Sequence, residues 1–354
     1  MESAIRNPKS AILIAGQGLA GTAVAWRLWE RGVRFVIADP DEAVTSSKIA
    51  AGLVTPVTGR RLNLSWRIDE FLPEARAFYS RVEKLLGEDF YREAEYLRLL
   101  NDEREVAWWK ERQSRGELQP WLKPGVEVLP NTSAFFRDEL GGFVQQHAGW
   151  LDTAVYLKAS REFFARHNAV RAARVEENEV EAREDSVRWQ GGDFAAVVFC
   201  RGWREQDSAR FFPWLKFDSM QGVIAALKAG LPDERIVNRG AWLLPRGGGE
   251  WRAGSTYEVD LARPMEESIA DLRGKLERFL KVPFELGEAQ RGVRPIVKQR
   301  QLILGRHPVH GRVCLLNGLG SKGTLRAPFF AKMLVEHLLD DKPLEGAVDV
   351  RSND

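Results

Sequence analysis

Three glycines near the start of the chain have the spacing of a pyrophosphate-binding loop. Gly16, Gly18 and Gly21 fit the pattern G-x-G-x-x-G. In such a loop the first glycine turns the chain, the second lets backbone N–H groups reach phosphate oxygens, and the third lets a helix pack closely on a strand. The N-terminal end of that helix carries partial positive charge, which attracts phosphate. This stretch therefore predicts a bound dinucleotide.

The residues around this loop predict the elements that must position it. An apolar run, Ala11 to Ala15, precedes it, a segment with helical periodicity follows, and a second apolar run spans Val33 to Ala38. This order predicts strand, tight turn, helix and strand. Asp39 ends the second strand near the offset at which an acid binds the adenosine ribose. An ordinary glycine turn in an α/β protein is the alternative.

A second glycine-rich loop lies near the other end of the chain. Gly318, Gly320 and Gly323 follow an apolar run that predicts a strand. Pro328 is expected in the first turn of the helix that comes next, and Lys322 lies just before that helix. Two anion-binding helix ends, one at each end of the chain, suit a ligand with a pyrophosphate and an electron-rich ring. The sequence therefore predicts a flavin dinucleotide, FAD.

Small residues dominate the segment that follows Asp39, which is SSKIAAGLVTP at positions 46–56. Small side chains let a planar ring or a phosphate lie against backbone N–H groups, and the hydroxyls of Ser46 and Ser47 could donate to phosphate oxygens. An ordinary surface loop is the alternative here.

The rest of the pattern predicts an α/β fold. Phe194 to Cys200 is typical of a buried parallel strand, and Arg201 and Gly202 follow it where such sheets hold ligands. Short strands around a GGG turn at 247–249 indicate a mainly antiparallel sheet. Helices are expected at 68–86, 102–115, 149–168 and 265–280, with strands at 91–100, 217–227 and 251–257. We expect a Rossmann-like FAD-binding domain from 1–86, 148–215 and 288–354, and a substrate-binding domain from 87–147 and 216–287.

Composition narrows the function classes. The 354 residues include 52 basic and 50 acidic ones, so a net charge of +2 argues against nucleic acid as a partner, although tRNA stays open. No apolar run approaches the ~20 residues that cross a bilayer, and we expect a cytoplasmic protein without a membrane partner. The two cysteines and five histidines show no ligand spacing, which predicts no metal site.

Five segments in fixed order resemble one enzyme family. They are AGQGLAG with Asp39, SSKIAAGLVTP, GWLD, PRGGGEWRAGST, and GVRP followed by NGLGSKGTLRAP. The chain resembles the FAD-dependent amine and amino-acid oxidoreductases related to D-amino-acid oxidase, glycine oxidase and sarcosine oxidase. It is particularly similar to the C-terminal oxidase half of the bifunctional enzyme that finishes the methylaminomethyl-thiouridine of tRNA wobble positions.

The resemblance implies a set of cofactor contacts. Asp39 would bind the ribose, where the family usually has Glu, and Val175 would meet the adenine. Covalent attachment in the sarcosine oxidases uses a cysteine near the active site, whereas Cys200 and Cys314 fall within predicted strands, so we predict non-covalent FAD. The implied cofactor residues are Gly16, Gln17, Gly18, Leu19, Ala20, Gly21, Asp39, Pro40, Ser46, Ser47, Lys48, Ala51, Gly52, Leu53, Val175, Cys200, Arg201, Gly202, Gly318, Leu319, Gly320, Ser321, Lys322, Gly323 and Thr324.

The resemblance also implies the catalytic residues. Arg294 of the GVRP segment would bind the carboxylate of the substrate, since a guanidinium fork matches that group, and a structural ion pair is the alternative. Trp242 and Tyr257 would line the pocket, with core packing as their alternative. Lys322 would stabilise the reduced flavin. The implied reaction is oxidation of a C–N bond in an amine or amino acid: hydride passes to flavin N5, the imine is hydrolysed, and oxygen reoxidises the flavin, with a quinone or carrier left open.

Three other functions are alternatives to this one. A stand-alone tRNA side-chain oxidase predicts a basic rim at the pocket and binding that weakens steeply with salt. A non-catalytic flavin-binding or redox-sensing protein would hold a flavin that no amine bleaches. A nicotinamide-dependent dehydrogenase is disfavoured, because no second strand-helix repeat follows Asp39.

Overall fold

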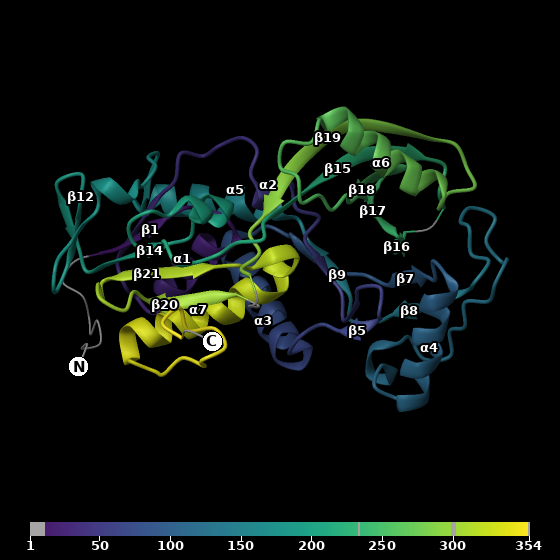
Figure 1. Ribbon diagram of the computed structural model, residues 1–354, viewed down its shortest axis with the longest axis horizontal. Helices are drawn as coiled ribbons and strands as arrows, with labels where there is room; N and C mark the ends of the chain where they lie inside the picture. Colours follow the sequence, from purple (N-terminus) through teal and green to yellow (C-terminus); the bar gives the residue numbers. More distant parts are fainter. Residues whose placement is uncertain (1–10, 233, 299–301, 353–354) are drawn as a thin grey trace.

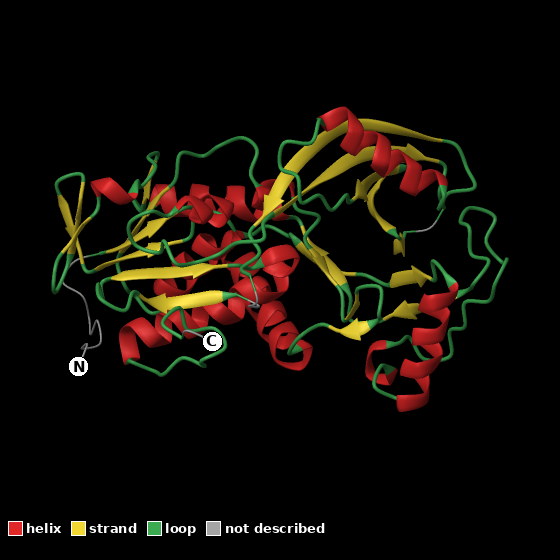
Figure 2. Cartoon of the chain, in the orientation of Figure 1, coloured by secondary structure: helices red, strands yellow, loops and turns green. Residues whose placement is uncertain are grey.

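The computed structural model describes residues 11–232, 234–298 and 302–352. Two large sheets dominate it, one with helices packed on it and one curved sheet beyond the first (Figures 1 and 2). The prediction of an α/β fold with a second, mainly antiparallel sheet is confirmed.

The first sheet has six strands in the order β10-β2-β1-β14-β21-β20, and all neighbours are parallel except β20 and β21. Its central strands are buried on both faces, which explains their continuous apolar runs. The strands are β1 (Ile12–Ala15), β2 (Phe35–Ala38), β10 (Val170–Arg171), β14 (Ala196–Phe199), β20 (Ile303–Arg306) and β21 (Val313–Asn317).

Helices cover one face of this sheet, and a small sheet covers the other. Ile12 and Ile14 pack in the cluster with the helices, while Leu13 and Ala15 pack toward the small sheet. The helices on the first face are α1 (Leu19–Glu30), α3 (Ile68–Leu86), α5 (Thr153–Arg166) and α7 (Gly323–Asp340). The small sheet comprises β11 (Glu181–Ala182), β12 (Val187–Trp189) and β13 (Gly192–Phe194).

The second large sheet has the order β19-β15-β18-β17-β16-β7-β8, and only the β7–β16 pair is parallel. The helix α6 (Met265–Glu277) packs on one face through Leu272 and Leu276. The strands are β7 (Tyr96–Leu99), β8 (Gly142–Gln145), β15 (Met220–Ala229), β16 (Ile236–Arg239), β17 (Ala241–Gly247), β18 (Glu250–Gly254) and β19 (Phe284–Arg294).

The other helices and strands lie outside these two large sheets. The remaining ones are α2 (Ser46–Ile49), α4 (Glu103–Arg115), β3 (Leu53–Val54), β4 (Val57–Thr58), β5 (Asn63–Leu64), β6 (Tyr91–Glu93), β9 (Gly149–Leu151), and short 3₁₀ turns at 119–121, 177–179, 202–207 and 320–322.

Two expected boundaries are wrong. The helix expected from Gly149 begins at Thr153, because residues 149–151 pair with β3 and β6 as strand β9. Asp152 then caps the helix, accepting a hydrogen bond from the backbone N–H of Val155 at 3.3 Å. The single strand expected at 91–100 is two strands, β6 and β7, which belong to different sheets.

The position of Pro328 is a further correction. It lies inside α7, which begins at Gly323, and not in the first turn. Proline has no N–H, so the carbonyl of Thr324 loses its usual helical donor. The hydroxyl of Tyr79 donates to that carbonyl instead, at 2.8 Å. The side chain of Arg27 in turn donates to the carbonyl of Pro328. The proline is thus accommodated because Tyr79 of α3 supplies the one missing donor.

All six strands of the first sheet come from the three segments expected to form the FAD-binding domain. The boundary predicted between 287 and 288 falls within β19, which runs unbroken to Arg294. The two-domain division stays a prediction. In the ranges that the structure covers, no helix has the length and apolar character needed to cross a bilayer.

Candidate active site

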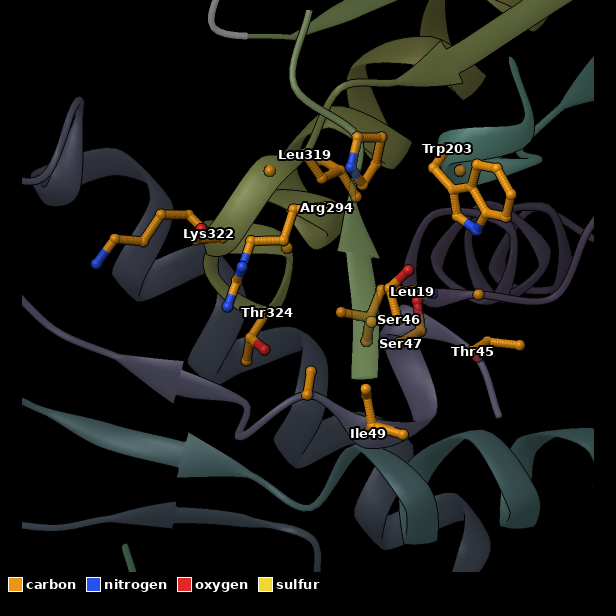
Figure 3. A pocket seen from close by; sticks show the side chains of 18 of the residues that line it. Leu19, Thr45, Ser46, Ser47, Ile49, Trp203, Arg294, Leu319, Lys322 and Thr324 are labelled. Carbon is orange, nitrogen blue, oxygen red and sulfur yellow. Dashed lines mark hydrogen bonds between the residues drawn. The ribbon is translucent and has the colours of Figure 1, made fainter. Parts of the chain in front are cut away.

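One cavity of about 760 Å³ extends between the carboxyl ends of the parallel strands and the inner face of the curved sheet. Among the residues implied from the sequence, all but Gly21 and Gly318 line it. Figure 3 shows Arg294 and Lys322 reaching this cavity from elements other than the one that carries Ser46 and Ser47. Segments from both ends of the chain therefore meet at one site.

The first glycine loop has the close contacts that its pattern predicts. Gly16 has φ +103°, and a Cβ there would lie 2.7 Å from the carbonyl oxygen of Cys200. A Cβ on Gly21 would lie 1.9 Å from the carbonyl oxygen of Gly16, so Gly21 allows α1 to approach the strand without lining the cavity. A Cβ on Gly18 would lie 2.8 Å from Oγ of Ser47. The backbone at this loop leaves an open cradle at the N-terminal end of α1.

The two serines that follow have different partners. Oγ of Ser47 accepts a hydrogen bond from the backbone N–H of Leu19 at 3.1 Å. This bond holds the Ser47 hydroxyl group at the N-terminal end of α1. The hydroxyl of Ser46 donates to the carbonyl of Val293 at 2.6 Å, which ties α2 to β19. Nζ of Lys48 donates to Asp41 at 2.7 Å. Of these three, Ser47 is best placed for a phosphate.

Asp39 holds the first glycine loop. Its carboxylate accepts from the backbone N–H of Gln17 at 2.7 Å and from that of Asp41 at 2.8 Å. Arg161 of α5, which was not predicted, donates to the side-chain oxygen of Gln17 at 2.5 Å and to the carbonyl of Asp39 at 3.2 Å. Within the described residues, Nε2 of Gln17 is buried without a partner. The ribose role of Asp39 stays a prediction.

Cys200, which follows the end of β14, lines the cavity. The positive charge of the next residue, Arg201, is already paired with acidic side chains. The guanidinium of Arg201 donates to Glu177 at 2.8 Å and to Glu205 at 2.9 Å. Burial raises the pKa of Glu205 and also that of the Cys200 thiol. Arg201 therefore has little charge left for phosphate, and non-covalent binding of FAD stays a prediction. Val175, predicted for adenine, is buried and lines the cavity.

The second glycine loop brings a buried ammonium group to the cavity. Nζ of Lys322 donates to Oγ1 of Thr55 at 2.6 Å, and Thr55 was not predicted. Burial, with a smaller contribution from Arg326, lowers the pKa of Lys322 to about 8. The N-terminal end of α7 is also positive, so this position is costly for a cation unless a negative group joins it.

Arg294 ends β19 with its guanidinium in the cavity. Nη2 donates to Oγ of Ser255 at 2.9 Å, and the guanidinium lies 4.3 Å from the ring centre of Tyr257. In the described parts of the chain, Nη1 is buried without a hydrogen-bond partner. A Cβ on Gly222 would lie 2.6 Å from Nη1, so this glycine makes room for the guanidinium. The structural ion pair considered as an alternative is not formed among these residues.

The aromatic residues Trp242 and Tyr257 line the cavity. The hydroxyl of Tyr257 is 3.0 Å from Oγ of Ser321, which joins the curved sheet to the second glycine loop. The ring of Trp242 lies over Gly254, where a Cβ would be 2.4 Å from it. Lone glycines inside strands often mark such close approaches, so Gly222 and Gly254 had a usable sequence signal.

The model of a family described as DAO, FAD dependent oxidoreductase, matches residues 11–337. The chain belongs to this family. The observed cradle, the unpaired donor at Gln17 and the ammonium at Lys322 fit the FAD that the family uses. This protein is therefore an FAD-dependent oxidoreductase.

Solved structures share its fold. Glycine oxidase from Geobacillus kaustophilus has 20% identity and a TM-score of 0.75, with 95% of each chain covered. Glycine oxidase from Bacillus cereus has 19% identity and a TM-score of 0.77, covering 95% of this chain and 99% of that one. Iminodiacetate oxidase from Chelativorans sp. has 19% identity and a TM-score of 0.74, covering 94% and 96%. L-α-glycerophosphate oxidase from Mycoplasma pneumoniae, solved with FAD bound, has 14% identity and a TM-score of 0.75, covering 94% and 95%.

The arginines at the edge of the cavity are paired with acids. Arg60 donates to Asp102 at 2.6 Å, and Arg174 and Arg204 both donate to Glu42. These three residues therefore form no free basic rim, and the tRNA alternative stays a prediction without support from them. Among the residues with described positions, no group of three His, Cys, Asp or Glu side chains could hold a metal ion.

Proposed function

We propose that the protein oxidises the C–N bond of an amino acid or a carboxylate-bearing amine, with Arg294 holding the carboxylate. The observation that carries this proposal is the buried, unpartnered Nη1 of Arg294 in the cavity. Burial lowers the pKa of this guanidinium, and a carboxylate bound there would restore the interactions that burial removes. A hydrogen bond to a charged group contributes about 1.5–3 kcal/mol.

The residues beside Arg294 hold its guanidinium in position. Tyr257 lies against one side of the Arg294 guanidinium, and Ser255 accepts a hydrogen bond from Nη2. The orientation of the unpaired Nη1 is therefore set before the substrate binds. Trp242 forms the neighbouring wall. When bound, FAD would supply an acceptor for the two electrons of the C–H bond that breaks as the C–N bond becomes an imine.

Proton handling needs no strong side-chain base when the amine binds unprotonated. The C–H bond breaks with both electrons leaving as hydride, the nitrogen lone pair forms the C=N bond, and water later hydrolyses the imine. Lys322 and the N-terminal end of α7 supply positive charge to the same cavity, which favours a ligand that gains negative charge. We propose oxygen as the final electron acceptor.

The test is anaerobic mixing of the FAD-loaded protein with glycine, sarcosine, D-amino acids and matched amines that lack a carboxylate. We expect a carboxylate-bearing amine to bleach the flavin absorbance. Arg294→Ala should raise KM for that substrate at least tenfold, about 1.4 kcal/mol, with a smaller effect on the matched amine. Equal KM in both proteins would show that Arg294 does not bind the carboxylate. A yellow protein that no amine bleaches would favour the non-catalytic alternative.

A further inference from the structure

The cavity continues past Trp242, away from Arg294, to a second polar cluster. The strand register places Arg98 of β7 beside Asn238 of β16, and Asn238 beside Trp242 of β17. All three side chains line the cavity. Because neighbouring strands lie about 4.8 Å apart, Arg98 is roughly 10 Å from Trp242 along the sheet.

The hydrogen bonds of this cluster neutralise its charge. Arg98 donates from Nη2 to Glu105 at 2.8 Å and from Nη1 to Oδ1 of Asn238 at 2.5 Å. The other carboxylate oxygen of Glu105 accepts from the backbone N–H of Asn101 at 3.0 Å. The side chains of Arg98 and Glu105 are 12% and 2% exposed. The cluster is thus a mostly buried ion pair with no net charge.

Arg98 and Asn238 each have an N–H donor without an acceptor among the described residues. In the part of the chain that is described, Nε of Arg98 is buried without a partner. Oδ1 of Asn238 faces Arg98, so the amide nitrogen on the other side of the same group is still a donor, and Asn238 is 9% exposed. Both oxygens of Glu105 are already accepting hydrogen bonds. The groups of Arg98 and Asn238 that remain unpaired are therefore donors.

One wall connects this cluster with the carboxylate end of the cavity. Tyr96 lies on β7 two residues before Arg98 and lines the same cavity. Burial raises the pKa of Tyr96 to about 12, with Arg98 lowering it and Tyr257 raising it. Tyr257 itself lies against Arg294, with its ring centre 4.3 Å from the guanidinium.

We propose that Arg98, Glu105, Asn238 and Asn101 form a distal subsite that binds an uncharged acceptor, a carbonyl or amide oxygen, at the far end of an elongated amino-acid substrate. This rests on the proposed function, because it places the substrate carboxylate on Arg294. An anionic tail would meet an arginine whose charge is already neutralised by Glu105, and a cationic tail would face the unpaired donors of Arg98 and Asn238. The middle of the substrate would lie across Trp242. The preferred substrates are therefore glycine derivatives whose nitrogen or α-carbon carries a tail ending in an amide.

The test compares two tails of equal shape. N-acylglycines carry no oxidisable amine, so their binding to the FAD-loaded protein is measured by calorimetry without turnover. One series ends its acyl tail in a primary amide and the other in an isopropyl group, over increasing tail lengths. We expect the amide series to bind at least tenfold more tightly at its best length. The corresponding N-alkylglycines should show the same preference in kcat/KM.

Asn238→Asp is the decisive variant, because it keeps an acceptor for Arg98 but removes the amide donor. It should abolish the preference for the amide tail, whereas Asn178→Asp, the same change at an exposed position outside the cavity, should keep it. Equal binding of the two tails, or a preference that survives Asn238→Asp, would overturn the subsite. If no amine bleaches the flavin, the proposed function fails while the binding preference still decides the subsite.

Discussion

At the scale of single residues, the buried ammonium group of Lys322 leads to a prediction about how the stability of the fold depends on pH. The pKa of Lys322 is lowered in the fold to about 8 from its ordinary 10.5, mainly by burial. Between these values the unfolded chain holds more protons than the folded one, so the stability contributed by this residue rises with pH across that window and is lowest below about pH 8. Lys322→Met should therefore raise the unfolding temperature of the FAD-free protein at pH 7. The gain should shrink as the pH rises from 8 to 10.5, measured by thermal unfolding.

A lysine on α7, the helix that follows Lys322, is the control. Lys332 is 49% exposed beside Glu74, so Lys332→Met should leave the pH profile close to that of the parent protein. A gain for Lys322→Met that is constant from pH 7 to 10.5 would mean that titration of the ammonium is not its source.

Residue types indicated side chains that line the cavity, but not where each one points. Arg294 follows from the GVRP segment, and the structure brings it to the cavity with a free donor. Arg201 also follows from its strand end, yet two buried acids hold its guanidinium. Arg161 and Thr55 have no local pattern, because each acts on a partner far away in the sequence. Contacts of this kind depend on the packing of whole elements.

At the scale of elements, Pro328 and Tyr79 predict a stability difference. Tyr79→Phe leaves the Thr324 carbonyl without its donor inside α7, which should destabilise the protein by about 1–3 kcal/mol. Tyr156→Phe is the matched control. It removes a hydroxyl that is buried without a partner in the described residues, so its effect should be neutral or stabilising. Urea unfolding measures both, and equal losses would mean that the Tyr79 bond contributes nothing.

The first glycine loop predicts a loss of cofactor. A Cβ on Gly21 would lie 1.9 Å from the Gly16 carbonyl, so Gly21→Ala must displace α1 from β1. Affinity for FAD should fall at least about tenfold, or about 1.4 kcal/mol. Gly230→Ala, where a Cβ would meet nothing within 4 Å, should bind FAD normally. Flavin absorbance per protein after gel filtration separates the two, and full retention by Gly21→Ala would contradict the close packing.

Periodicity predicted the long elements better than the short ones. The helix at 68–86 is predicted to the residue, because its apolar face repeats over five turns and Gly87 ends it with φ +71°. Residues 149–151 carry no such period, and they become a strand only because β3 and β6 lie on either side. Pro328 was placed by the usual preference of proline for a first helical turn, whereas here Tyr79 makes an interior position tolerable.

At the scale of the whole molecule, FAD binding should protect both ends of the chain together. The loops at 16–21 and 318–324 line or support one cavity, so hydrogen exchange should slow in both when FAD is added to the FAD-free protein. The sheet at 181–194 contributes no lining residue and should exchange at the same rate. Protection at 16–21 alone would show that the C-terminal loop does not take part in binding.

The pairing of β14 has a consequence for how the protein is made. This central strand lies between β1, near the start of the chain, and β21, near its end. While the ribosome is still extending the polypeptide, one edge of β14 has no partner, and helix α7 is not yet available to cover α1. A chain that stops before Val313 would contain the first glycine loop but would leave this edge of β14 open to association with other chains. The sheet that positions the first glycine loop is therefore complete only after residues 313–317 have been synthesised.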